Sequence, residues 1–492
     1  MSEPDVCSIL GATLNGADRQ VSATPATLPR SKTASIPRRL PPYAVFLLIA
    51  GINVLMLCIL TPPFEVHDEF QHYFRSYQLS EGSVMGTVRH GVPGAVIPES
   101  LPSFVMNTWG TLHVWQEPPL RTQSLDRLWH NFKQPLAPDR KAFTHFLMVS
   151  YSPIMYVPQA LAMTVGRWFS LSPLGLLYAA RLANALTLVA ITAAALWIMP
   201  AGSELALAIV LLPGCQYEFG SVAEDGVIIA ATFMFCALVM RSADKRSWSA
   251  GAAATAMLAG SVVCAKLVYA PLLFLALPLR LGGGISRRLV LVDLAIGAVS
   301  LGTALIWYHL SGATLHSFLL PPSRIALKEH LILSSPLQFA WSMLLDFHHH
   351  GFFYFQDAIG WLGVWTVPLP VVTYLLAVVA LLGGGMVSIV PGGRGRSGLA
   401  AWCLLLGAAV VVLLETAMFL VNSPAGTLHI DGMQGRYFLP LGALAAVCVP
   451  GIRGVRLPVA AANLIYIEMI IILILNTGAL DYSVIFGFHL LR

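Results

Sequence analysis

Long blocks of mainly apolar residues constrain the fold of this chain more than any other feature. The blocks at 44–60, 177–199, 289–308 and 399–421 are each long enough to cross about 30 Å of hydrocarbon as a helix. Only 11% of the 492 residues are charged, against about 25% in an ordinary soluble domain. A water-soluble protein of this length could not cover its surface with so few charges. The blocks therefore predict a multi-pass membrane protein.

Charge and cysteine content narrow the classes of partner and cofactor. The formal net charge is +5, but basic residues in a membrane protein first report its topology, so we do not expect nucleic-acid binding. The 7 cysteines are scattered and show no CxxC or His/Cys metal spacing. Disulfides and structural zinc are therefore not expected.

The N-terminal segment differs in composition from the rest of the chain. Residues 1–40 contain no aromatic side chain, are rich in Ser, Thr, Pro and Ala, and end in the basic group Arg30, Lys32, Arg38 and Arg39. This composition predicts a disordered tail over residues 1–42, and the basic flank predicts that the tail is cytoplasmic. The segment before the first span is longer than the start of a cleavable signal peptide. We therefore expect the first helix to be retained.

The apolar segments can be arranged as about eleven crossings of the membrane. If residues 151–169 form an outer helix that does not cross, the basic loops at 241–246, 287–288, 394–396 and 453–456 all face the cytoplasm. Residues 62–176 then form a large outer loop with interfacial helices. We predict an all-α polytopic fold for residues 43–492, with spans near 43–61, 177–199, 204–218, 226–240, 249–265, 267–280, 289–309, 364–383, 399–421, 438–452 and 457–477.

The densest group of polar residues begins where the first span ends. From residue 64 to residue 77, aromatic and charged residues alternate at helical spacing, which predicts an amphipathic helix on the membrane surface. Asp68, His72 and Arg75 lie at i, i+4 and i+7, so the carboxylate could lie between the imidazole and the guanidinium. Such a carboxylate suits a general base or a ligand of a divalent cation. The alternative is a solvated polar face of an interfacial helix.

Charged residues also interrupt the apolar blocks at three later places on the predicted outer face. Glu224 and Asp225, with Glu218 nearby, form an acidic turn that either faces water or a cation, or only separates and caps two helices. Lys266 breaks an apolar stretch and suits a lipid phosphate, or else marks a helix end. Arg436 precedes a span and could grip two phosphate oxygens as a fork, or act as an interfacial anchor.

Several of these motifs occur together in a recognisable order. They are Pro62-Pro63, Asp68-Glu69-x-x-His72-x-x-Arg75, Tyr151-Ser152-Pro153, Arg181-Leu182-x-Asn184, Lys266 and Gly435-Arg436-Tyr437-Phe438-Leu439-Pro440. In this order the chain resembles the bacterial membrane-protein family catalogued as domain of unknown function 2142, over most of the residues after 43. That family is similar in turn to the GT-C class of glycosyltransferases, which take a sugar from a polyprenyl-phosphate carrier.

The resemblance implies candidate site residues. The acidic position of the first outer loop falls on Asp68 or Glu69, which would be the catalytic residues, and the second acidic position falls on Glu224 or Asp225. A divalent cation, Mg²⁺ or Mn²⁺, shared by Asp68 and Asp225 is compatible with the motif but not required. The implied substrate-binding residues are His72, Arg75, Glu224, Asp225, Lys266 and Arg436.

The resemblance also implies a function and a location. The expected protein is a GT-C-like glycosyltransferase of the bacterial inner membrane, with its N-terminus in the cytoplasm and its active site on the outer face. It would move a sugar from a polyprenyl-phosphate donor to a cell-envelope glycan or a lipid-linked acceptor, with the lipid bilayer as its surroundings. The alternatives are a transporter or flippase for a lipid-linked sugar, and a non-enzymatic partner in envelope assembly.

Overall fold

The fold is that of a computed structural model, which describes residues 39–110, 125–281, 286–318, 322–389, 397–424, 426–451 and 457–488. Except for residues 39–42, the predicted N-terminal tail lies outside the described residues. The basic loops at 394–396 and 453–456 lie outside them as well.

Long apolar helices form the main bundle. Within the described ranges, seven helices are long and apolar enough to cross a membrane, and the structure is 76% helical. Each of the seven overlaps a predicted span, although α16 starts later than predicted because a short hairpin precedes it. The helices are α1 (Pro42–Leu60), α6 (Pro173–Ile198), α9 (Asp225–Asp244), α12 (Arg287–Leu310), α16 (Val371–Ser388), α17 (Ser397–Val421) and α19 (Val459–Tyr482), the last continued by η8 (Ser483–Gly487).

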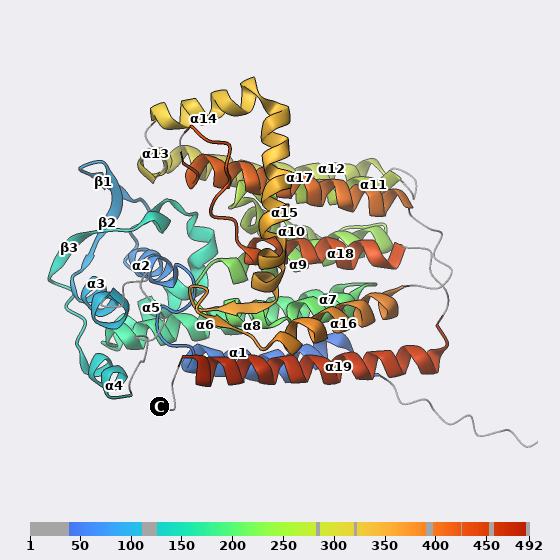
Figure 1. Ribbon diagram of the computed structural model, residues 1–492, viewed down its shortest axis with the longest axis horizontal. Coiled ribbons are helices and arrows are strands. Elements are labelled where there is room, and N and C mark those ends of the chain that lie inside the picture. The colour runs from blue at the N-terminus through green and yellow to red at the C-terminus, as the bar shows by residue number, and fades with distance from the viewer. Residues whose placement is uncertain are drawn as a thin grey trace, which may run out of the picture. The chain divides into compact units, whose positions relative to one another are not determined.

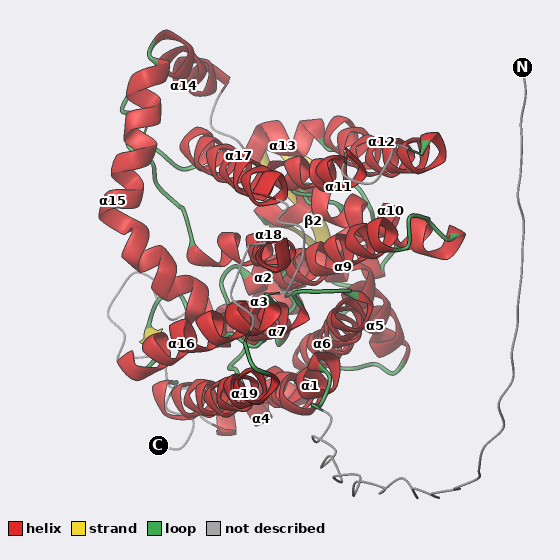
Figure 2. Cartoon of the chain, turned by 90° about the vertical axis from the view of Figure 1, so that its right-hand side faces the viewer, coloured by secondary structure: helices red, strands yellow, loops and turns green. Residues whose placement is uncertain are grey.

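Shorter helices occupy the remaining predicted spans. Figures 1 and 2 show them running alongside the long helices. Proline explains three of the interruptions, because it lacks the N–H that would continue a helix: Pro213 starts α8, and Pro271 and Pro440 lie inside η5 and η6. The elements are α7 (Ser203–Val210), α8 (Pro213–Phe219), α10 (Ala250–Cys264), η5 (Leu267–Leu275), α11 (Ala276–Leu281), η6 (Gly435–Leu441), α18 (Gly442–Cys448) and η7 (Val449–Gly451).

The segment between α1 and α6 folds into a polar cap at one end of the bundle (left in Figure 1). It contains an antiparallel sheet of β1 (Thr87–Arg89), β2 (Val92–Pro98) and β3 (Lys141–His145), in that order. The prediction of a purely helical loop is therefore wrong here. His90 and Gly91, between β1 and β2, both have positive φ, as a tight two-residue hairpin turn requires.

The helices of the cap surround α2 (Glu69–Ser80). The prediction that this amphipathic helix lies on the membrane surface is wrong, because ten of its twelve residues are buried. Its aromatic side chains Tyr73, Phe74 and Tyr77 pack into the core of the cap, while Glu69 at its start pairs with Arg181 of the bundle helix α6. The other elements of the cap are α3 (Ser100–Val105), η1 (Met106–Gly110), α4 (Leu125–Lys133), η3 (Leu147–Ser150), η4 (Pro153–Tyr156) and α5 (Val157–Trp168).

Helix α5 was predicted to stay on the outer side. Its 12 residues extend about 18 Å, well short of the roughly 30 Å of hydrocarbon. It packs against α2 and α6, and Arg167 near its end donates to the backbone carbonyl of Ser80 in the cap. That residues 151–169 do not cross the membrane stays a prediction, because α10 occupies a predicted span with only 15 residues.

A second irregular region follows α12. It comprises α13 (Gly312–Phe318), α14 (Pro322–Ser334), α15 (Pro336–Gly360) and a small hairpin of β4 (Trp361–Leu362) and β5 (Val367–Pro368). Figures 1 and 2 both show α15 running across the direction of the bundle helices. The C-terminal end of α15 and the hairpin reach the junction between cap and bundle.

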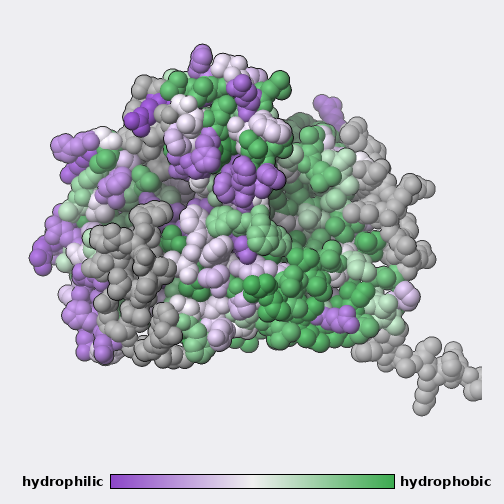
Figure 3. Space-filling view, viewed as in Figure 1, coloured by the Kyte–Doolittle hydropathy of each residue, from purple (hydrophilic) through white to green (hydrophobic). Residues whose placement is uncertain are grey.

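Hydropathy separates the two ends of the described structure. Figure 3 shows hydrophilic side chains over the cap and near α14, and hydrophobic ones over the bundle. Large apolar side chains such as Leu294, Leu375 and Ile467 remain exposed on α12, α16 and α19. Exposed apolar surface on this scale is expected where lipid covers it.

Candidate functional site

The junction of cap and bundle holds Asp68, the residue just before α2. Asp68 adopts a left-handed backbone conformation (φ 58°), so its side chain leaves the register of the helix that follows. Its carboxylate accepts hydrogen bonds from Gln71 Nε2 at 3.3 Å and from Arg436 Nη2 at 3.3 Å. The Asp68 side chain is 34% exposed.

Arg436 connects three carboxylates. Its Nη2 lies 3.3 Å from Asp68, its Nε lies 3.0 Å from Asp225 Oδ2, and its Nη1 lies 3.6 Å from Glu218 Oε1. The preceding residue has to be glycine, because a Cβ at Gly435 would come within 2.2 Å of the backbone oxygen of Tyr354. This close approach sets the guanidinium against the N-terminal end of α9.

Lys266 joins the same group from the junction of α10 and η5. Its ammonium lies 2.5 Å from Asp225 Oδ1 and 2.6 Å from Glu224 Oε1. Lys266 and Arg436 therefore both contact Asp225, although they are far apart in the sequence. Asp225 therefore brings the two cations together.

His72 extends the group into the cap. Its Nε2 lies 2.8 Å from Glu224 Oε2 and its Nδ1 lies 2.8 Å from the hydroxyl of Tyr156. The prediction that a carboxylate at Asp68 lies between His72 and Arg75 is wrong, because Asp68 precedes the helix and turns toward Arg436. We call the connected set Asp68, Arg436, Glu218, Asp225, Lys266, Glu224 and His72 the ion network.

Arg75 lies outside the ion network. It is fully buried and donates to Gln78 and to the backbone carbonyls of Val84 and Tyr151. Burial without a carboxylate partner lowers the pKa of Arg75 to about 10. The predicted substrate-binding residue Arg75 instead ties α2 to the loop before β1 and to the segment before η4.

Glu69 also departs from its predicted catalytic position. Both its oxygens are bound by Arg181 of α6, at 2.7 Å from Nε and 2.5 Å from Nη2, and neither side chain is exposed. Arg181 donates further to the backbone carbonyls of Cys58, Thr61 and Pro62. This closed arrangement holds the end of α1 against α2 and α6 and leaves the Glu69 carboxylate no access to a substrate.

Two members of the ion network, Glu224 and Lys266, keep their charge through each other and their neighbours. Burial opposes ionisation of Glu224, but His72 and Lys266 hold its pKa well below the ordinary value. Burial likewise disfavours the ammonium of Lys266, but Asp225 and Glu224 raise its pKa well above the ordinary value. Lys266 therefore stays protonated, and one of its three N–H donors lies outside the contacts with these two carboxylates.

The predicted cation shared by Asp68 and Asp225 does not fit this geometry. The Arg436 guanidinium contacts both carboxylates and so takes the place where a divalent ion would bridge them. Within the described ranges, no three His, Cys, Asp or Glu side chains are arranged to hold a metal ion.

Asp357, which lies near the ion network, was not predicted from the sequence. A cavity of about 20 Å³, room for about one water, is lined by Glu218, Arg436 and Asp357 among others. Asp357 accepts from the backbone N–H of Gly435 at 2.6 Å and from Trp365 Nε1 at 3.1 Å. It thereby fixes the Arg436 segment to the β4–β5 hairpin. Its place near the end of α15, followed by Gly360 and Gly363, was the available signal.

The fold and the ion network together define a class: a multi-pass membrane protein with a charged, partly open site where a polar cap meets the bundle. One family model, described as predicted membrane protein (DUF2142), matches residues 52–445. The chain belongs to this family, and the matched region contains the whole ion network. No curated protein matches the chain.

Proposed function

We propose that this protein is a GT-C-like glycosyltransferase that moves a sugar from a polyprenyl-phosphate donor to a cell-envelope glycan or a lipid-linked acceptor. The observation that supports it is Asp68, which is the most exposed carboxylate of the ion network at 34%, while the others are 8% exposed or less. An open carboxylate beside two held cations is the arrangement that acid–base chemistry on a phosphate-linked substrate needs.

In the proposed reaction Asp68 accepts the proton of the acceptor hydroxyl. The acceptor oxygen forms a bond to the anomeric carbon of the sugar as the bond from that carbon to the phosphate oxygen breaks. The electron pair of the breaking bond stays with the phosphate, whose added charge needs cationic contacts. Lys266, which is 17% exposed and has one N–H donor beyond its two carboxylate contacts, supplies one of them, and Arg436 supplies the other.

Asp225 positions these two cations in the proposal. It contacts Lys266 with one oxygen and Arg436 with the other, so neither side chain has to be ordered when the donor binds. Groups held in place in this way stabilise developing charge without reorganisation during the reaction. Glu224 connects these cations to the cap, because it contacts both Lys266 and His72 of α2.

The experiment is a transfer assay with the purified protein. A panel of polyprenyl-phosphate sugars is supplied with cell-envelope glycan acceptors, and release of the polyprenyl phosphate is followed. Acceptor-dependent release from at least one donor supports the proposal. Movement of intact donor between leaflets of a vesicle without release would instead favour the alternative, a transporter or flippase.

The topology is part of the proposal. Eleven crossings in the bacterial inner membrane, with a cytoplasmic N-terminus, place Ser247 inside and Ser83 of the cap outside. In a Cys7→Ser background, a membrane-impermeant maleimide should label Ser83→Cys in intact spheroplasts and Ser247→Cys only after lysis. The reverse pattern would invert the proposed orientation.

A further inference from the structure

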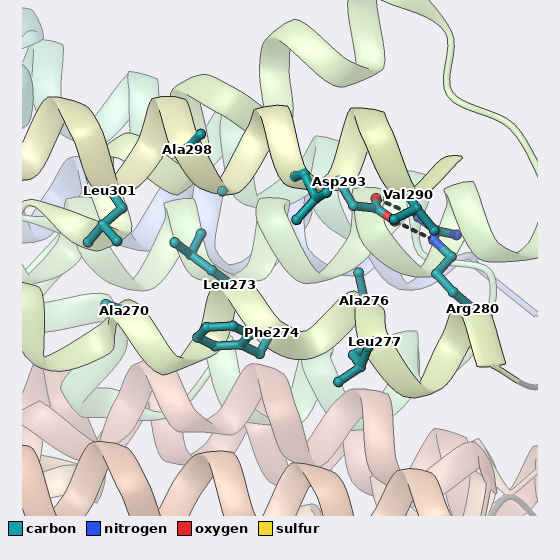
Figure 4. A pocket seen from close by; sticks show the side chains of 12 residues that line it. Ala270, Leu273, Phe274, Ala276, Leu277, Arg280, Val290, Asp293, Ala298 and Leu301 are labelled. Carbon is teal, nitrogen blue, oxygen red and sulfur yellow. Dashed lines mark hydrogen bonds and ion pairs between the residues drawn. The ribbon is translucent and has the colours of Figure 1, made fainter. Parts of the chain in front are cut away.

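A groove on the lipid-facing side of the bundle lies between η5 and α11 on one wall and α12 on the other (Figure 4). Its volume is about 580 Å³. Leu273, Phe274 and Leu277 line the first wall, and Leu294, Gly297 and Leu301 line the second. The lining is apolar along most of its length, so the groove suits a hydrocarbon chain.

One end of the groove is polar. Arg280 Nε and Nη2 lie 2.7 and 2.9 Å from the two carboxylate oxygens of Asp293, and Nη2 also donates to Ser242. Trp248 Nε1 donates to the same carboxylate at 2.9 Å. Arg280 is only 7% exposed, and its Nη1 has no hydrogen-bond partner among the residues that the structure describes. A buried guanidinium nitrogen without a partner indicates a missing acceptor.

Basic residues surround this polar end, which is the end of the bundle opposite the cap (Figure 1). Arg287 and Arg288 open α12 beside Arg280 and are exposed, as are Arg241, Lys245 and Arg246 at the end of α9. Asp293, which pairs with Arg280, and the exposed Asp244 are fewer than these basic residues, so the end of the groove is net positive. Basic pockets between membrane helices at such a surface suit anionic lipid head groups.

We propose that this groove is a binding site for an anionic phospholipid, with one acyl chain along α12 and the phosphate at the Arg280 end. The site goes beyond the proposed sugar transfer, because the ion network lies toward the other end of the bundle. The phosphate would complete the hydrogen bonding of Arg280, and the head group would lie among Arg287 and Arg288. A bound lipid would then join α12 to η5 and α11.

The glycines of α12 provide a matched pair of variants. A Cβ at Gly297 or at Gly302 would meet no atom within 4 Å, so a side chain can start at either position without a clash. Gly297 lines the groove and Gly302 does not. Gly297→Leu should fill the groove, and Gly302→Leu should change the same helix elsewhere.

The test is native mass spectrometry of the full-length protein after reconstitution in phosphatidylcholine vesicles containing a minor share of phosphatidylglycerol. Wild type and Gly302→Leu should retain phosphatidylglycerol in preference to phosphatidylcholine, and Gly297→Leu should lose most of it while keeping the thermal midpoint of Gly302→Leu. The double variant Arg287→Gln/Arg288→Gln should weaken phosphatidylglycerol binding by about fivefold for each charge removed.

Three results would overturn the proposal. Equal retention of the two phospholipids would mean that charge plays no part, and unchanged retention in Gly297→Leu would place the lipid elsewhere. In vesicles that also contain polyprenyl phosphate, preferential retention of that lipid in the groove would assign the groove to the substrate chain. None of these readouts depends on sugar transfer, so failure of the proposed function leaves this test intact.

Discussion

Asp68 and Glu69 are neighbours in the sequence but belong to two different kinds of ion pair. Glu69 meets Arg181 through two short contacts, and both side chains are fully buried. Asp68 meets Arg436 through one contact of 3.3 Å and is 34% exposed. The left-handed backbone at Asp68 separates the two side chains. Asp68 ends the loop with its carboxylate partly exposed, whereas Glu69 starts the buried helix α2.

The difference gives the two adjacent acidic residues of this motif different roles. A buried, fully bonded pair holds three segments together but has no lone pair left for a substrate. A partly exposed carboxylate with only two long contacts, one to each oxygen, keeps lone pairs free for proton transfer. Similar residue types at adjacent positions therefore predict the place of the site better than they predict which residue acts.

Breaking the buried Glu69–Arg181 pair should give the largest loss of stability. Glu69→Gln leaves the Arg181 guanidinium buried without a charged partner, which typically costs about 3 to 5 kcal/mol. We expect a greatly reduced yield of folded protein and a large fall in the thermal midpoint in detergent. Asp431→Asn is the control, since the side chains of Asp431 and its partner His429 are both exposed and such pairs contribute about 1 kcal/mol or less. Equal stability of the two variants would contradict the structural assignment of Glu69.

Changing the partly exposed Asp68–Arg436 pair should affect the binding of lipid phosphate more than folding. Arg436→Lys keeps the positive charge but cannot contact three carboxylates and a phosphate with one fork. Loss of one charge-assisted hydrogen bond, about 1.5 to 3 kcal/mol, should weaken polyprenyl-phosphate binding roughly 10- to 100-fold. Titration by microscale thermophoresis measures it. Unchanged affinity in a folded variant would remove Arg436 from the phosphate site.

The ion network should also make the stability of the folded protein depend on pH. This effect should be smaller than those of the two substitutions above. The pKa of Glu224 is depressed in the folded protein, so its contribution to stability is complete above its unfolded pKa of about 4.3 and is lost as the pH falls below that value. Between pH 6 and pH 3, wild type should therefore lose more stability than Glu224→Gln. Glu329→Gln, at an exposed position of α14, should behave like wild type. Parallel curves for wild type and Glu224→Gln would show that Glu224 is not held by His72 and Lys266.

The sequence predicted the parts of this molecule that depend on local pattern. The long apolar blocks became helices near their predicted positions, and the charged breaks at Asp225, Lys266 and Arg436 met in one place. The cap sheet was missed because its strands are short and β2 contains proline and glycine, which weaken strand patterns. The role of Glu69 depends on Arg181, 112 residues away, and no local pattern identifies such a partner.

Asp68→Asn tests the central claim most directly. The substitution keeps the volume and hydrogen-bonding capacity of the side chain but removes the charge that accepts a proton. The release of polyprenyl phosphate should fall by about two to four orders of magnitude, while folding and donor binding should change far less. If the folded variant released the carrier at the wild-type rate, Asp68 would not be the base, and the glycosyltransferase account of this site would be contradicted.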